Sequence, residues 1–196
     1  MREQTTTALL EGLTDPANEA IWRVFDARFR PIVFGFARRM GLSTEEAADA
    51  TQETLTRFVT GYRQGRYDRG KGRLQAFILG IARNCALETL RAHRQRRERR
   101  GMSAIDALPG PDDIEQLWQA QYERAILDEA VRRLRESTNV EQRTIRAFEG
   151  VVLQGRSPRD VAGELGMSTN EVYVAKHRCL RRMRELTRHV QTLYDS

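Results

Sequence analysis

The sequence predicts an all-α protein of two helical domains, and three observations support that fold class. Apolar residues recur at three- and four-residue spacing along most of the chain, and no segment alternates as a strand does. The 196 residues are 40% hydrophobic, which suits one domain or two small ones with folded cores. A stretch rich in Gly, Pro and Asp at 101–115 separates two helical blocks and predicts a domain boundary.

The first helical block begins at Asp15-Pro16, where a capping carboxylate precedes a proline and predicts a helix start. Apolar residues continue this helix, and Pro31 predicts a kink or break within it. After Gly41, the pair Ser43 and Glu46 predicts a capping box for a helix over about 44–60. We expect its buried face to hold Ala47, Ala50, Thr54, Leu55 and Phe58, and its exposed face Glu45, Asp49, Gln52 and Glu53.

A glycine-rich segment at 61–72 predicts a loop with two tyrosines and several cations, and a helix of about 25 residues follows from Leu74. Aromatic rings and cations in such a loop can hold an unstacked base. The candidate strand-binding residues are Tyr62, Arg66, Tyr67 and Lys71, extended along the helix by Arg83, Asn84, Arg91 and Arg94. A solvated loop with an arginine-rich tail fits the composition equally well.

The second block predicts helices over residues 117–134, about 141–154, 158–165 and about 169–190. Ser157-Pro158 opens a short helix, Gly166 makes a turn, and Ser168 with Glu171 caps a longer helix. This is the helix-turn-helix pattern, whose second helix enters the major groove of DNA. We favour DNA binding over an ordinary helical hairpin with a basic face. Outward-facing candidates are Thr169, Asn170, Tyr173, Lys176 and His177, with Arg178, Arg181 and Arg182 placed for phosphates.

Charge alternates along the chain, although its formal total is only +6. Counting basic minus acidic residues, residues 1–60 carry 7 − 9 = −2, 61–100 carry 12 − 3 = +9, 101–131 carry 1 − 7 = −6, and 132–196 carry 13 − 8 = +5. Two basic blocks separated by an acidic one predict two polyanion-facing surfaces joined by a segment of another kind.

Several other classes of protein are not supported. The sequence holds no apolar run of about 20 residues and no signal peptide, which predicts a soluble cytoplasmic protein. Cys85 and Cys179 fit core positions rather than a disulfide or metal framework. The three histidines lack metal-ligand spacing, and no nucleophile or phosphate-binding motif is present, so we expect neither an enzyme nor a metal or cofactor.

Three segments, taken in order, resemble the bacterial sigma-70 family of RNA polymerase sigma factors, in its small extracytoplasmic-function (ECF) group. EEAADATQETLTRF (45–58) is similar to region 2.2, FILGIARNCALETLR (77–91) to the helix that follows it, and residues 155–186 to the region 4 helix-turn-helix. The resemblance implies an N-terminal extension (1–14), a region 2-like domain (15–100), an acidic linker (101–124), a region 4-like domain (125–190) and a C-terminal tail (191–196).

The resemblance also implies a role for each candidate surface. Asp49, Gln52 and Glu53 match positions that dock onto the β′ subunit of core polymerase. The loop 61–72 and the helix bearing Arg83 and Asn84 match the part that melts the −10 promoter element and captures a non-template base. Residues 169–177 match the helix that reads the −35 element. The linker would run through the RNA exit path of the polymerase, whose β subunit also belongs to the core.

The sequence departs from the family at several of these positions. Ala48 stands where the family often has an acidic residue, and Phe77 stands where it has a tryptophan. Tyr173, Val174 and Ala175 replace the usual polar or basic residues of the reading helix, so the −35 sequence preference of the family does not transfer to this chain. Many relatives are held inactive by an anti-sigma factor. Phosphorylation by a Ser/Thr kinase is another hypothesis, because Thr44, Thr51, Thr54 and Thr56 surround the docking face, although hydroxyls satisfied within the helix are the favoured interpretation.

The predicted function is therefore a non-enzymatic sigma factor that binds core polymerase, recognises the −35 and −10 elements and promotes melting. A stand-alone, dimeric helix-turn-helix regulator is the alternative, and it would bind a palindromic duplex without polymerase. A nucleic-acid enzyme such as a recombinase would need a nucleophile or metal cluster that we do not find.

Overall fold

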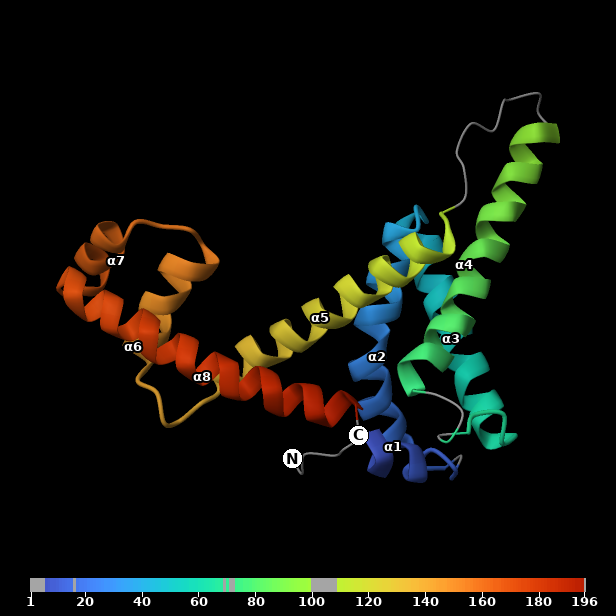
Figure 1. Cartoon of the computed structure of the whole chain (residues 1–196), viewed down its shortest axis with the longest axis horizontal. Helices are drawn as coiled ribbons and strands as arrows, with labels where there is room; N and C mark the ends of the chain where they lie inside the picture. The colour runs from blue at the N-terminus through green and yellow to red at the C-terminus, as the bar shows by residue number, and fades with distance from the viewer. Residues whose placement is uncertain (1–5, 16, 69, 71–72, 100–108, 196) are drawn as a thin grey trace. The chain divides into compact units, whose positions relative to one another are not determined.

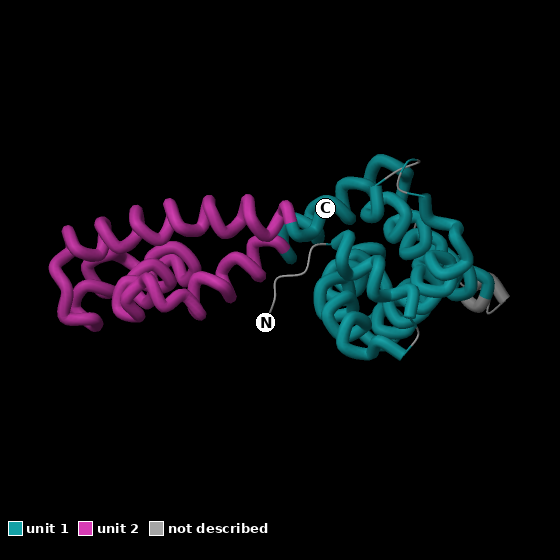
Figure 2. The backbone as a smooth tube through the Cα atoms, turned by 90° about the horizontal axis from the view of Figure 1, so that it is seen from below, with its two compact units in different colours: residues 1–125, 193–196 teal, residues 126–192 magenta. Residues whose placement is uncertain are grey.

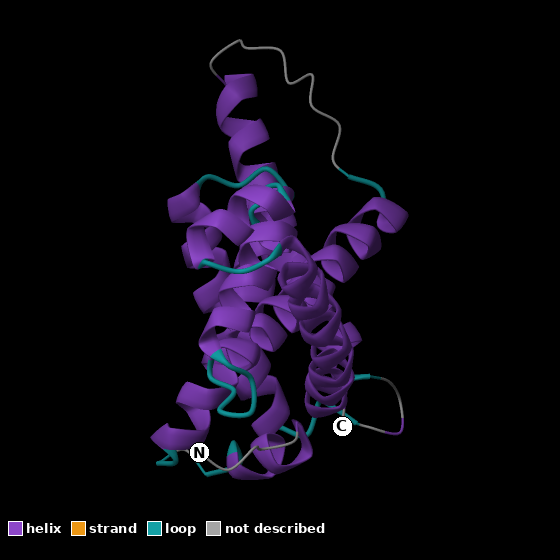
Figure 3. Ribbon diagram, turned by 90° about the vertical axis from the view of Figure 1, so that its left-hand side faces the viewer, coloured by secondary structure: helices purple, strands orange, loops and turns teal. Residues whose placement is uncertain are grey.

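The computed structural model describes residues 6–15, 17–68, 70, 73–99 and 109–195, and in this part of the chain it is helical with no strand (Figures 1 and 3). The all-α prediction is confirmed. The chain divides into two compact units: unit 1 is residues 1–125 with 193–196, and unit 2 is residues 126–192 (Figure 2).

Unit 1 contains α1 (Thr6–Gly12), α2 (Glu19–Arg39), α3 (Thr44–Arg63), α4 (Leu74–Arg99) and the first part of α5 (Pro111–Arg135). Its core lies where α2, α3 and α4 pack together, and its largest buried side chains include Phe25, Phe29, Phe36 and Phe58. The predicted capping box is present, since the Ser43 hydroxyl accepts the Glu46 N–H and the Glu46 carboxylate accepts the Ser43 N–H.

Four boundaries in this part of the chain differ from the prediction. Asn18, not Asp15, caps α2, since its side chain accepts the Ile21 N–H, and Pro16 lies outside the described residues. Helix α2 runs through Pro31 without a break. Pro31 is exposed while Ile32 and Val33 are buried, so packing offsets the roughly 3 kcal/mol that an interior proline costs. Helix α3 extends to Arg63, so the loop begins at residue 64.

The fourth difference concerns the segment after the predicted domain boundary. Helix α5 begins at Pro111 rather than at residue 117, so residues 111–124 of the predicted linker are helical. In unit 1 this part of α5 packs on α2: the Trp118 ring lies edge-on to Phe36 at 5.6 Å between centroids. Trp118 and Tyr122 are buried there. Helix α5 therefore begins inside the segment 101–115, although the apolar residues of that segment show no helical spacing.

Unit 2 contains the rest of α5, α6 (Gln142–Phe148), a π-helical turn η2 (Glu149–Leu153), α7 (Pro158–Leu165) and α8 (Thr169–Asp195) up to residue 192. Two apolar clusters form its core. One joins α5, α6 and α8 through residues such as Leu134, Phe148 and Cys179, and the other joins α6, α7 and α8 through Ala147, Val161 and Val172. Both cysteines are free and buried, as predicted.

Candidate functional site

A cluster of aromatic rings in unit 1 leads from the core to the loop after α3. Phe58 stacks on Phe25 with 4.8 Å between ring centroids, and it contacts Tyr62 at 6.1 Å and Phe77 at 6.0 Å. Tyr67, in the loop, lies 5.4 Å from Phe77 and 6.3 Å from Tyr62. Phe25 and Phe58 are fully buried, whereas the outer three rings are half-buried. The core thus supports three rings that remain accessible to a ligand.

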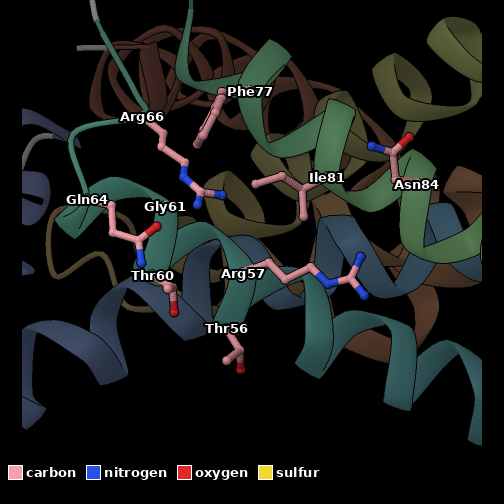
Figure 4. A pocket seen from close by; sticks show the side chains of 9 residues that line it. All are labelled: Thr56, Arg57, Thr60, Gly61, Gln64, Arg66, Phe77, Ile81 and Asn84. Carbon is pink, nitrogen blue, oxygen red and sulfur yellow. The ribbon is translucent and has the colours of Figure 1, made fainter.

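A pocket of about 380 Å³ opens between α3 and α4 beside these rings (Figure 4). In Figure 4 the Arg66 side chain reaches from the loop toward the space between the two helices, next to Phe77. Aromatic surface combined with cations and amides is what proteins use to hold unstacked bases. The lining residues are Thr56, Arg57, Thr60, Gly61, Gln64, Arg66, Phe77, Ile81 and Asn84.

The structure brings some of the predicted strand-binding residues together and separates others. Tyr62 and Tyr67 belong to the aromatic cluster, and Arg66 and Asn84 line the pocket. Arg83, Arg91 and Arg94 are exposed on α4 but do not line it. Arg91 and Arg94 lie seven and ten residues beyond Asn84, roughly 10–15 Å along the helix. Lys71 lies outside the described residues.

The predicted strand-binding set contains only Arg66 and Asn84 of the nine lining residues; sequence reasoning missed the other seven, among them Arg57, Gln64 and Phe77. Helical spacing could have found part of the set, because Phe77, Ile81 and Asn84 stand at i, i+4 and i+7 and share one face of α4. Arg57 bridges the two helices: its Nε donates to Glu53 Oε1 at 2.6 Å and its Nη2 to Glu88 Oε2 at 3.1 Å. Its hydrogen bonds to Glu88 and Glu53 raise the pKa of Arg57.

The predicted polymerase-docking residues all lie exposed on α3. Asp49, Gln52 and Glu53 stand at i, i+3 and i+4 and therefore share one face. Two of these side chains already bind arginines of the same chain: Arg30 Nη2 donates to Gln52 Oε1 at 2.8 Å, and Arg57 forms an ion pair with Glu53. Asp49 makes no hydrogen bond or ion pair with another side chain in the described part of the chain.

The threonines assigned to the surroundings of this face divide into two pairs: the burial of Thr54 was predicted, whereas the burial of Thr51 corrects the prediction. Thr51 and Thr54 are fully buried, and their hydroxyls donate to the carbonyls of Ala47 and Ala50, both at 2.6 Å. Thr44 and Thr56 are exposed. Because Thr51 and Thr54 face the core, a kinase could reach them only after α3 opened, and the favoured interpretation of satisfied hydroxyls holds for this pair.

The helix-turn-helix elements of unit 2 form with the predicted local signals. The Ser157 hydroxyl accepts the Asp160 N–H at 3.1 Å at the start of α7, and Gly166 ends α7 in the left-handed region with φ 59°. The Glu171 carboxylate accepts the Ser168 N–H at 2.7 Å, completing the second capping box. Arg143 of α6, which sequence reasoning did not use, donates from Nε to the Leu165 carbonyl at 3.0 Å and fastens the turn.

The predicted DNA-facing residues of α8 do not all point outward. Thr169, Asn170, Tyr173, His177, Arg178 and Arg181 are exposed, whereas Lys176 is half-buried. Arg182, assigned to phosphates, is half-buried and pairs with Glu185 at 2.8 Å. Val174, which the predicted set omits, is 59% exposed.

Neither a metal centre nor a membrane segment emerges from the described residues. They contain no group of three or more His, Cys, Asp or Glu side chains that could hold a metal ion. None of their helices is both long and apolar enough to cross a membrane.

Comparison with known proteins agrees with this geometry. Residues 25–97 match the family Sigma-70 region 2, which covers α3, most of α2 and most of α4. A curated relative is 27% identical over 183 residues, which is 91% of this chain and 92% of its own length. Residues 25–97 therefore carry a sigma-70 region 2 domain, and the chain as a whole is similar to a sigma factor of that family. That relative is the ECF RNA polymerase sigma factor RpoE of Cereibacter sphaeroides, and the similarity extends over nearly the whole of both chains.

Proposed function

We propose that this chain is a non-enzymatic subunit that binds core RNA polymerase, directs it to promoters and opens the DNA there. The aromatic cluster at the pocket between α3 and α4 carries this proposal. Its half-buried rings stand on a fixed core beside Arg66 and Asn84, which suits the capture of a base from a melted strand and not the reading of intact duplex.

The free energy of binding an unpaired base then favours opening of the −10 element. Stacking on an aromatic ring stabilises an unpaired base by about 1–3 kcal/mol. The pocket offers this stacking only to a strand that has left the duplex, while the exposed Arg83, Arg91 and Arg94 of α4 bind the phosphates on either side. The site therefore stabilises the open state over the closed one.

Binding to the polymerase is assigned to the acidic face of α3, and recognition of the −35 element to α8. Asp49 supplies the accessible charge of that face, with Gln52 and Glu53 beside it, for a basic surface on β′. The exposed residues of α8 meet base edges, and Arg178 and Arg181 contact the backbone. Because the −10 site and the −35 site belong to one chain, neither site has to bind its promoter element tightly alone.

The test is reconstitution of the full chain with core polymerase on a promoter library, followed by transcription and opening assays on a selected promoter. Tyr67→Ala removes one stacking surface, so we expect opening, followed by 2-aminopurine fluorescence at the −10 element, to fall about tenfold at unchanged affinity for core. Asp49→Arg should give the opposite pattern, with core binding about tenfold weaker. The matched control is Glu19→Arg, a charge reversal at an exposed acid of α2.

Failure of the wild-type chain to bind core or to support initiation contradicts the proposal. A dimer that binds a palindromic duplex without polymerase would identify a stand-alone regulator instead.

A further inference from the structure

Val174 lies on the outward face of α8. The inward side of this helix carries Val172, Ala175 and Cys179, all buried. Opposite them, at i, i+4, i+7 and i+11, stand Asn170, Val174, His177 and Arg181. Thr169 and Lys176 lie nearer the buried side of the helix, and Lys176 is accordingly half-buried. The face that meets a partner therefore includes Val174, although the predicted set of DNA-facing residues, which was chosen for polarity, leaves it out.

Folding does not explain a valine at this position. Among the large hydrophobic side chains that the structure describes, Val174 is the most exposed, at 59%. Valine also has a lower helix propensity than Ala, Lys or Arg, because its branched side chain loses rotamer freedom in a helix. The residue costs the folded state free energy and contributes nothing to either core cluster of unit 2.

The surroundings of Val174 indicate which partner covers it. Arg178 and Arg181 are exposed and pair with no carboxylate in the described residues, so two cations flank the valine on its C-terminal side. The Glu171 carboxylate, the nearest acid on the helix, is held by the Ser168 N–H and hydroxyl in the capping box. An apolar spot within a cationic face at the start of a recognition helix fits duplex DNA, where the 5-methyl group of thymine is the apolar feature of the major groove.

We propose that Val174 is a specificity determinant that contacts a thymine methyl group in the −35 element. This inference rests on the proposed function, because it assigns a base to the same reading helix. Asn170, one turn earlier on the same face, can form paired hydrogen bonds with a neighbouring adenine, and His177 lies one turn later. The family resemblance did not supply this preference, since this part of the helix departs from the usual polar or basic residues.

The test uses holoenzyme and a promoter selected from a library randomised in its −35 region. Each thymine of the selected element is replaced singly by deoxyuridine, which removes only the methyl group. With wild-type chain we expect one position at which this change weakens binding about fourfold, the effect of one buried methyl group. In holoenzyme carrying Val174→Ala, the ratio of thymine to uracil affinities at that position should fall to about one.

Val152→Ala is the matched control, because it truncates another exposed valine of unit 2, in η2. It should keep the fourfold ratio. Three results would overturn the inference: equal affinity for thymine and uracil at every position, a selected element without thymine, or an unchanged ratio in Val174→Ala. If the wild-type holoenzyme still initiates transcription in these cases, the proposed function stands. Loss of initiation by the wild-type holoenzyme removes both.

Discussion

Cys179 lies in a fully buried environment of unit 2, with its Sγ 3.7 Å from the Thr144 carbonyl oxygen. Burial raises the pKa of Cys179 to about 11, against about 8.5 in an unfolded chain. The folded state therefore keeps this proton in a pH range in which the unfolded state loses it.

The sign of the resulting pH dependence follows directly. Below about pH 8.5 both states are protonated and the stabilising contribution is complete; between about pH 8.5 and 11 it is lost, because only the unfolded thiol ionises. We expect the free energy of unfolding of the wild-type chain to fall with pH more steeply than that of Cys179→Ala, by up to about 1.4 kcal/mol per pH unit. Urea unfolding of both proteins between pH 8 and 10.5 measures this difference, and parallel curves would contradict it.

Single residues were predictable where their chemistry is local. Ser43, Ser157 and Ser168 cap the helices that follow them because a hydroxyl needs only the N–H groups of the next turn. Thr51 shows the limit: its type fits an exposed helix position, but the packing of α3 turns it inward. Which side of a helix is buried depends on its neighbours, and an isolated threonine does not reveal it.

Two glycines distinguish helical propensity from packing at the scale of secondary-structure elements. A Cβ at Gly163, in α7, would meet nothing within 4 Å, whereas a Cβ at Gly150, in η2, would lie 2.8 Å from Val161 Cγ2. Val161 is buried and β-branched, so it cannot move aside easily. Gly150 is thus required for α7 to approach η2.

We expect Gly163→Ala to stabilise unit 2 by about 0.5–1 kcal/mol through helix propensity. Gly150→Ala should destabilise it by about 1–3 kcal/mol through overpacking. Native-state hydrogen exchange of amides in unit 2 is the suitable measurement, because Trp22 and Trp118, the two tryptophans, belong to unit 1. The explanation fails if the two substitutions shift exchange in the same direction.

Elements were predicted best in type and least well at their ends. Periodicity identified α2, α3, α4 and α8, yet α2 continues through Pro31 and α3 continues past Gly61. Gly61 is buried near Phe77 and Arg66, where its small size suits the wall of the pocket rather than a turn. Local breaker signals were overridden at both places because burial of the flanking apolar residues outweighs the cost of one unfavourable residue.

At the scale of the whole molecule, the last residues of the chain complete unit 1. Leu193 and Tyr194 are buried there. Thr6 Oγ1 donates to both of their carbonyls, at 2.8 and 3.0 Å, and the Arg28 guanidinium lies 5.0 Å from the centre of the Tyr194 ring. Asp195 accepts hydrogen bonds from Gln75 and from the Tyr122 hydroxyl, both at 2.6 Å.

We therefore expect Tyr194→Ala to destabilise unit 1 by about 3 kcal/mol, the loss typical of a buried aromatic ring. The readout is hydrogen exchange at the amides of α1 and α2, which should become faster. Gln191→Ala, at an exposed position of the same helix, is the control and should leave this exchange unchanged. Unaltered protection of α1 in Tyr194→Ala would show that these contacts do not stabilise unit 1.

The sequence by itself determined the helical class, the caps at Ser43, Ser157 and Ser168, the helix-turn-helix and the alternation of charge, because each depends on periodicity, on near neighbours along the chain or on simple counting. Only the tertiary structure decided which side chains meet from distant segments: Phe77 and Gln64 with Arg57 at the pocket, Trp118 on Phe36, and Tyr194 against Arg28. It also decided that Val174 stays exposed on the outward face of α8. The physical reason is that burial is a property of packed elements, so the residues left exposed for function are known only once the core is assembled.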